Sequence, residues 1–242
     1  MIETVLFDLD ATLIDDGPNW RHSVVETAKA VAKRHDLSEA NVQQSFYQGA
    51  GSIWQKIGGV EAPPWGNMDD PEIVEQIWSS VFATHGIDDG LSLANASDQY
   101  LQLRRGHVEA YDDAHACLET LKEKYLLGLV TNGWASQQCV KLATAGLSAY
   151  FACVVTTDCG YGKPHPEMFM VAIREMGADP QTTVYVGDSL RSDIVGGQRA
   201  HLKTVWLNRK ATARKPDDPE PDKTITSLTE LPPTLSSWPN GQ

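Results

Sequence analysis

The sequence predicts an α/β fold, in which a doubly wound, Rossmann-like parallel sheet carries an inserted α-helical domain. Five short apolar runs alternate with helix-like stretches, and this alternation is typical of doubly wound sheets. Each run is almost continuously apolar, as expected for a strand that helices cover on both faces. A long segment with helical periodicity and no convincing strand predicts the insertion. The five runs are residues 4–7, 126–130, 153–156, 183–186 and 204–207.

The insertion follows the first strand and extends over residues 16–106. We expect four helices in it, because apolar residues recur at helical spacing. Asn19 is expected to cap the first of these helices. The loop 58–70 is rich in turn-forming residues and would connect two of these helices. The expected helices cover residues 19–35, 37–51, 70–86 and 92–105.

Strand and helix alternate again after the insertion, with helices expected over residues 113–124 and 166–176. Residues 223–227 can add an edge strand after a Pro- and Asp-rich stretch. The expected domains are therefore an α/β core, residues 1–15 and 107–242, and a helical domain, residues 16–106. Where the two meet, Arg104, Arg105 and His107 would either contact an anionic substrate or form a solvated hinge.

The composition excludes several classes of partner. The chain has 242 residues, 32 acidic against 20 basic, and a formal net charge of -12. This excess of negative charge disfavours binding to nucleic acid or to an anionic membrane. No apolar run approaches the roughly 18 residues that span a bilayer, and the first residues do not resemble a signal peptide. We expect a cytoplasmic monomer or homodimer that binds a small molecule.

Polar side chains follow four of the predicted strands. The carboxyl ends of parallel strands form the ligand-binding crevice of an open sheet, so these side chains should converge there. Asp-x-Asp alone is also compatible with a solvated turn, and Gly-Asp-x4-Asp alone with a helix cap. Four such elements in this order favour a site. Its residues are Asp8 and Asp10 after the first strand, Thr131 and Asn132 after the second, Lys163 after the third, and Asp188 and Asp193 after the fourth.

The charges of these residues indicate a phosphate site that contains a metal. Asp8, Asp188 and Asp193 would repel one another in one cleft unless a cation neutralised them. Mg²⁺ suits a few carboxylates together with phosphate oxygens, and Lys163 adds a positive charge. Phosphoryl transfer also needs a nucleophile and a proton donor, and Asp8 and Asp10 can divide these tasks.

These elements resemble the four motifs of the haloacid dehalogenase-like hydrolases, in the family's order. By this resemblance, Asp8 would be the nucleophile that forms an aspartyl-phosphate. Asp10 would be the general acid, and then the base for the attacking water. Lys163 would balance the charge between nucleophile and phosphate. The matching elements are Phe7-Asp8-Leu9-Asp10-Ala11-Thr12-Leu13, Val130-Thr131-Asn132-Gly133, Lys163-Pro164, and Gly187-Asp188-Ser189 through Asp193.

The resemblance also implies the binding residues. Thr131, Asn132 and Lys163 would bind the phosphoryl group. Asp8, Asp188 and the backbone carbonyl of Asp10 would hold Mg²⁺, with Asp193 and Thr12 in supporting roles. The helical insertion is similar to the family's type-one cap, which closes over small substrates.

One residue departs from the family pattern. Ala11 stands where the family usually has glycine, and we expect a slightly stiffer turn rather than a loss of activity. Within the family, short strings such as Leu13-Ile14-Asp15 and Thr204-Val205-Trp206-Leu207-Asn208 are most similar to the N-acylneuraminate-9-phosphatase group.

The expected activity is Mg²⁺-dependent hydrolysis of a small phosphorylated metabolite, either a sugar phosphate or a nucleotide. A phosphosugar mutase would use the same aspartates, so it remains an alternative. A hydrolytic 2-haloacid dehalogenase is disfavoured because Asp10 is present. A non-enzymatic binding module would more naturally have lost Asp8, Asp10 or Lys163.

Overall fold

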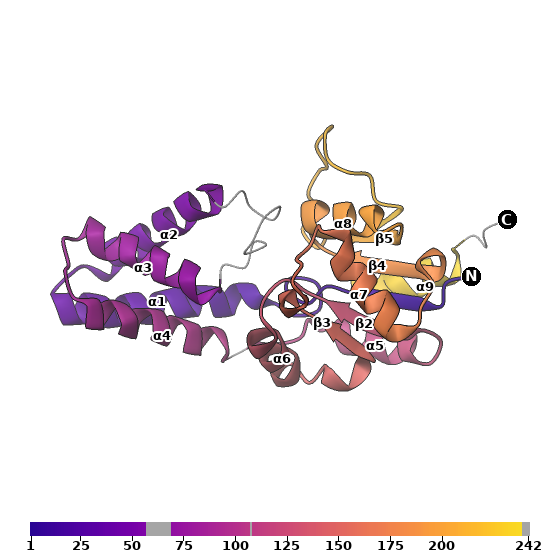
Figure 1. The fold of residues 1–242 in the computed structure, drawn as a ribbon, viewed down its shortest axis with the longest axis horizontal. Coiled ribbons are helices and arrows are strands. Elements are labelled where there is room, and N and C mark those ends of the chain that lie inside the picture. Colours follow the sequence, from indigo (N-terminus) through magenta and orange to yellow (C-terminus); the bar gives the residue numbers. More distant parts are fainter. Residues whose placement is uncertain (57–68, 107, 239–242) are drawn as a thin grey trace. The chain divides into compact units, whose positions relative to one another are not determined.

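The computed structural model describes residues 1–56, 69–106 and 108–238, without the side chains of residues 54–56. The chain forms two compact units, an α/β unit of Met1–Asp15 with Glu109–Gln242 and a helical unit of Asp16–Val108 (Figure 1). Most of the expected connector, up to residue 68, lies outside the described residues, as does His107. None of the helices in the described part of the chain has the length and apolar character needed to cross a membrane.

The α/β unit contains one six-stranded sheet, in the order β3-β2-β1-β4-β5-β6. Every neighbouring pair of strands is parallel, which confirms the predicted fold class. The five apolar runs form its first five strands, and the edge strand expected from residue 223 is also present. The strands are β1 (Thr4–Phe7), β2 (Leu126–Val130), β3 (Cys153–Val155), β4 (Thr183–Gly187), β5 (Lys203–Leu207) and β6 (Lys223–Ile225).

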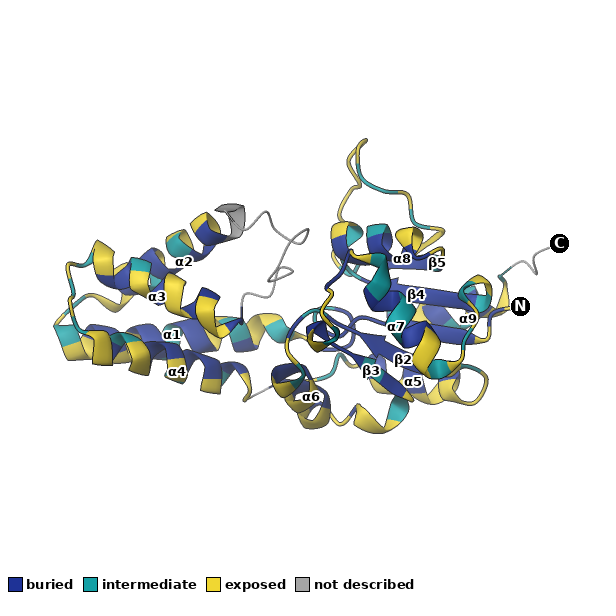
Figure 2. Cartoon of the chain, in the orientation of Figure 1, coloured by how far each residue is buried: buried dark blue, intermediate teal, exposed yellow. Residues whose placement is uncertain are grey.

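Helices cover the sheet, so its central strands are buried along their length (Figure 2). Crossover connections between parallel strands are right-handed. The helices of connections that run in one direction along the sheet therefore lie on one face, and those of connections that run in the other direction lie on the opposite face. The apolar side of α7 packs on β2 and β3, where Met168 and Phe169 are fully buried. The helices of this unit are α5 (Ala114–Lys122), α6 (Ala135–Thr144), α7 (Pro166–Met176), α8 (Val195–Arg199) and α9 (Leu231–Ser236).

The described part of the helical unit contains four helices around a core of its own. Phe46, Trp78 and Tyr100 are buried in this core, and the Phe46 ring packs against the rings of the other two. Asp70 and Asp89 begin the third and fourth helices, because their carboxylates accept hydrogen bonds from backbone N–H groups of the first turn. The helices are α1 (Asp16–His35), α2 (Glu39–Lys56), α3 (Pro71–Thr84) and α4 (Gly90–Arg104).

The expected cap at Asn19 is wrong. Helix α1 already begins at Asp16, and Asn19 lies buried within it. Its side-chain amide donates a hydrogen bond to the carbonyl oxygen of Arg104, at 2.8 Å. Asparagine is favoured at helix starts because it bonds to nearby backbone, but here its partner belongs to a distant helix. Sequence pattern alone does not reveal such a partner.

Arg104 forms neither a solvated hinge nor a free anion-binding group. Its side chain is 5% exposed and forms ion pairs with Asp16 and Asp69. Two nitrogens of its guanidinium group donate to the Asp69 carboxylate, both at 2.7 Å. Arginine is suited to such bidentate pairing. The cluster therefore ties α1 and α4 to residue 69 within the helical unit.

Candidate active site

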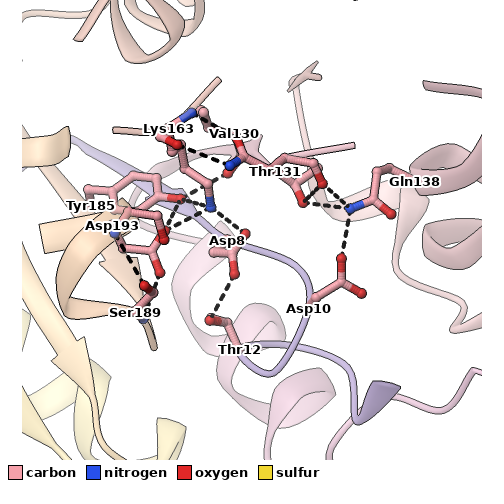
Figure 3. Close-up of polar contacts among 12 residues, drawn as sticks. Asp8, Asp10, Thr12, Val130, Thr131, Gln138, Lys163, Tyr185, Ser189 and Asp193 are labelled. Atoms are coloured by element: carbon pink, nitrogen blue, oxygen red, sulfur yellow. Dashed lines mark hydrogen bonds and ion pairs between the residues drawn. The ribbon is translucent and has the colours of Figure 1, made fainter. Parts of the chain in front are cut away.

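The predicted site residues of the α/β unit come together at the carboxyl end of its sheet (Figure 3). Asp8 is the first residue after β1, and its N–H extends the strand pairing by donating to Val186 at 2.9 Å. Thr131 follows β2 in the same way, donating to Val155 at 3.0 Å. Backbone pairing therefore fixes where both side chains begin.

Lys163 lies at the centre of the site. Its ammonium group donates to Asp8 Oδ1 at 2.5 Å, to Asp193 Oδ1 at 2.7 Å and to the Tyr185 hydroxyl at 3.0 Å (Figure 3). Burial disfavours the charged amine, but the attraction of Asp193 and Asp8 outweighs burial and raises the pKa of Lys163. Lys163 therefore stays positively charged beside Asp8, where a phosphate would need a counter-charge.

Asp193 is fixed beside Lys163 by contacts of its own. It is fully buried, and its second oxygen accepts a hydrogen bond from the N–H of Ser189 at 2.8 Å. Gly187 makes room for it, since a Cβ there would lie 2.4 Å from the Asp193 carboxyl carbon. Both Asp193 oxygens thus have hydrogen-bond partners, and one of these partners is Lys163.

Three carboxylates crowd into this cleft. Oxygens of Asp8, Asp188 and Asp193 lie within 4.8 Å of one another. Burial raises the pKa of Asp8 to about 7, despite the opposing effect of Lys163. Burial, with the charges of Asp193 and Asp8, also raises the pKa of Asp188 well above its usual value. One ammonium group does not compensate three carboxylates, so the cluster favours a further cation.

The first motif turns sharply after Asp10. Ala11 has a φ of 61°, in the left-handed region, and its N–H donates to the Ile14 carbonyl at 2.9 Å. Glycine adopts this region without a steric penalty, which accounts for its usual presence at this position in the family. The turn also directs the Thr12 hydroxyl toward Asp8 Oδ2, at 3.4 Å.

The second motif is joined to Lys163 through the backbone. The Asn132 amide accepts from the Lys163 N–H at 2.7 Å and donates to the Lys163 carbonyl oxygen at 3.1 Å. Thr131 is almost fully buried. In this arrangement the Asn132 side chain fixes the backbone from which the lysine side chain extends.

Sequence reasoning missed two residues that contact Asp10, Gln138 and Lys141, both on α6. Gln138 Nε2 donates to Asp10 Oδ2 at 2.7 Å, and Lys141 Nζ donates to Asp10 Oδ1 at 2.9 Å. Nothing in the motif pattern distinguished them from other polar helix residues. Their spacing of three residues, which places them on one helix face, was the available signal.

Three further supporting residues were also missed. The Tyr185 hydroxyl donates to the Val130 carbonyl at 2.8 Å, so it links Lys163 to the end of β2. The Trp206 indole donates to the Asp188 carbonyl at 2.8 Å. Arg209 donates to the Thr12 carbonyl at 2.9 Å and thereby supports the first motif.

Arg209 is itself held by Asp113, which also accepts hydrogen bonds from Ser227 and from the N–H of Leu228. Although burial disfavours its charged form, these bonds hold the pKa of Asp113 below its usual value. Asp113→Asn should therefore lower the free energy of unfolding by about 2 kcal/mol at pH 7, measured by urea denaturation.

A lowered pKa stabilises the fold above the unfolded value of about 4, and this contribution is lost as the pH falls through the folded value. The difference between wild type and Asp113→Asn should thus shrink below about pH 4. Asp112→Asn, at the exposed neighbouring position, is the matched control. Equal stabilities of the two variants at pH 7 would show that Asp113 does not tie these segments together.

The chain is similar to known hydrolases over nearly its whole length. It is 30% identical over 240 residues to N-acylneuraminate-9-phosphatase of Mus musculus, covering 98% of this chain and 94% of that protein. The crystal structure of the hydrolase YfnB from Bacillus subtilis, bound to magnesium, has a TM-score of 0.76 and 25% identity, covering 97% and 98% of the two chains.

A 2-haloacid dehalogenase from Pseudomonas syringae pv. Tomato DC3000 has the same fold, with a TM-score of 0.71 and 24% identity over 99% and 100% of the chains. Residues 2–201 match the family described as haloacid dehalogenase-like hydrolase. Together with the four motifs converging on one edge of a parallel sheet, this match means that the chain belongs to the haloacid dehalogenase-like hydrolase family.

Proposed function

We propose that the protein is a Mg²⁺-dependent phosphomonoester hydrolase that acts on a small metabolite through an aspartyl-phosphate on Asp8. The ion pair of Asp8 with Lys163 carries this proposal, since it places a charged amine beside a buried carboxylate at the carboxyl end of the sheet. Asp10 follows two residues later, and its side chain is 32% exposed, so it can face a substrate.

The chemistry of the donors fits Mg²⁺. Asp8 and Asp188 provide hard carboxylate oxygens close together, and both carry raised pKa values, mainly because burial disfavours their charged forms. We propose that these two, with the backbone carbonyl of Asp10, hold the ion. A bound Mg²⁺ would supply neutralisation of negative charge on the carboxylates and on the phosphoryl oxygens.

The proposed reaction has two steps. In the first, a carboxylate oxygen of Asp8 attacks phosphorus, and the ester P–O bond breaks with its electron pair on the leaving oxygen. That oxygen takes a proton from Asp10. In the second, water attacks phosphorus and gives a proton to Asp10, while the bond to Asp8 breaks and restores its carboxylate. The sum is a phosphomonoester plus water giving an alcohol plus inorganic phosphate.

The remaining residues bind and orient. Lys163 balances the charge between Asp8 and the phosphoryl group, and Asp193 keeps it in place. Thr131 and Asn132 are proposed to line the phosphoryl site. The helical unit, expected as residues 16–106, is proposed to act as a cap that shields the site from water, and the α/β unit, expected as residues 1–15 and 107–242, as the catalytic core.

Two other activities use the same fold. A phosphosugar mutase would return the phosphoryl group to its substrate instead of passing it to water. A 2-haloacid dehalogenase needs no acid after the nucleophile. Asp10 is present two residues after Asp8 with a partly exposed side chain, which favours a reaction that uses an acid at this position.

Phosphate release from a panel of phosphorylated compounds tests the proposal. The panel should contain N-acylneuraminate 9-phosphate, smaller sugar phosphates, nucleoside monophosphates and phosphorylated acids, each with Mg²⁺ and with EDTA. We expect release from at least one compound without a bisphosphate activator, and a loss of at least about a hundredfold in EDTA. Halide release from a 2-haloacid without Mg²⁺, and no phosphate release, would contradict the proposal.

A further inference from the structure

Helix α6 presents two buried polar side chains to the first motif. Gln138 and Lys141 are one helical turn apart, and they are 2% and 4% exposed. Each binds a different oxygen of Asp10, Gln138 at 2.7 Å and Lys141 at 2.9 Å. The Asp10 carboxylate is therefore held at both oxygens, while its side chain remains 32% exposed.

The second motif is shaped to accept Gln138. Its Nε2 also lies 2.8 Å from Thr131 Oγ1 and 2.8 Å from the Asn132 carbonyl oxygen (Figure 3). Gly133 has a φ of +125°, and a Cβ there would lie 3.1 Å from the Gln138 side chain. A residue with a side chain would be strained at Gly133 and would crowd Gln138. The turn that carries Thr131 thus also fixes the amide that reaches Asp10.

A buried ammonium group needs compensation, because removing it from water is costly. Asp10 supplies a compensating charge to Lys141, although the Asp10 side chain is itself partly exposed. Proton transfer requires the acid to be within hydrogen-bond reach of the reacting oxygen, so a freely rotating Asp10 would often be misplaced. Two fixed donors restrict that rotation.

We propose that Gln138 and Lys141 are positioning residues, which hold the Asp10 carboxylate where it transfers protons to and from the reacting oxygens. This inference rests on the proposed function. It predicts that loss of either side chain impairs the proton transfers of Asp10 and leaves the attack of Asp8 largely unaffected. Neither residue belongs to the four motifs.

Pre-steady-state kinetics with 4-nitrophenyl phosphate separate these steps. Nitrophenolate leaves without needing a proton, so its release reports the attack of Asp8, whereas later turnover reports hydrolysis of the aspartyl-phosphate. For Lys141→Met and Gln138→Leu we expect a burst rate within about threefold of wild type. Steady-state turnover should fall by about 10- to 100-fold, since positioned acid-base groups contribute about that much or more.

Two controls accompany these variants. Val140→Ala, on the exposed side of the same helix, should leave both phases unchanged. Lys141→Arg should recover part of the steady-state rate, because it restores a cation next to Asp10. Thermal melting of every variant identifies unfolded protein. If a variant lost burst and steady-state rates in equal proportion while still folded, the role would be structural and the inference would be overturned.

A double-mutant cycle with Asp10→Asn decides the question. Asp10→Asn alone should slow steady-state turnover by about a hundredfold or more, and adding Lys141→Met should slow it by no more than about twofold further. If the losses caused by Asp10→Asn and Lys141→Met multiplied in the double variant, the inference would be overturned. The proposed function would stay intact. Absence of any burst or turnover in wild type on 4-nitrophenyl phosphate and on the substrate panel would instead overturn the proposed function, and the inference with it.

Discussion

Asp8→Asn should abolish phosphate release, with a loss of about a thousandfold or more, because an amide oxygen is too weak a nucleophile to attack phosphorus. Lys163, held in place by Asp193, would remain to bind the phosphoryl group. The loss should therefore appear in kcat, with a smaller change in KM. Steady-state phosphate release on the best compound of the panel measures both constants.

The fold should tolerate this change. Asp8 is one of three carboxylates in a cluster that contains one ammonium group, so removing a negative charge relieves part of the repulsion. We expect the melting temperature to stay equal or to rise. Asp217→Asn, an exposed position in the same unit, is the matched control and should keep full activity. Residual activity of Asp8→Asn above about one hundredth of wild type would exclude a covalent intermediate on Asp8.

Lys163→Met should damage both activity and stability. Without the ammonium group, Asp8 and Asp193 would face each other unpaired in a buried site, where their side chains are 8% and 0% exposed. Breaking a buried ion pair by removing one partner costs about 3–5 kcal/mol. Turnover should fall by about a thousandfold, since the phosphoryl group also loses its counter-charge. Urea denaturation and phosphate release measure the two effects.

A second substitution separates the two effects. Lys163→Met combined with Asp193→Asn removes one of the two unpaired carboxylates, so it should recover part of the lost stability and none of the lost activity. Lys210→Met, at an exposed position, should change neither quantity. If Lys163→Met were as stable as wild type, the lysine would not be compensating these carboxylates.

Most of the sheet could be predicted from the sequence. The buried strands are almost entirely apolar, and their predicted limits lie within one residue of those observed for β1, β2 and β4. The start of α1 could not be predicted, because Asn19 looks like a cap and finds its partner on α4. The environment of Arg104 could not be predicted either, because Asp16 and Asp69, the two carboxylates that bind it, are distant in sequence.

The candidate site was predictable where a residue directly follows a strand, as Asp8 and Thr131 do. Parallel pairing brings such positions together whatever the intervening sequence. Tyr185 was missed because it lies within a buried strand, where its ring packs against Phe169 like an apolar side chain while its hydroxyl accepts a hydrogen bond from Lys163. The spacing of Gln138 and Lys141 places them on one face of α6, but their contact with Asp10 depends on how α6 packs.

The central position of β1 has a consequence for how the enzyme is made. Strand β1 leaves the ribosome well before β2 and β4, the two strands with which it pairs. Among the described residues, the core of the helical unit comes from its own segment, so we expect this unit to fold while β1 still lacks partners. Lys163 donates hydrogen bonds to Asp8, Tyr185 and Asp193, and of these residues Asp193 is translated last. Nascent chains that end before it cannot form the complete catalytic centre, so activity should arise abruptly, late in synthesis.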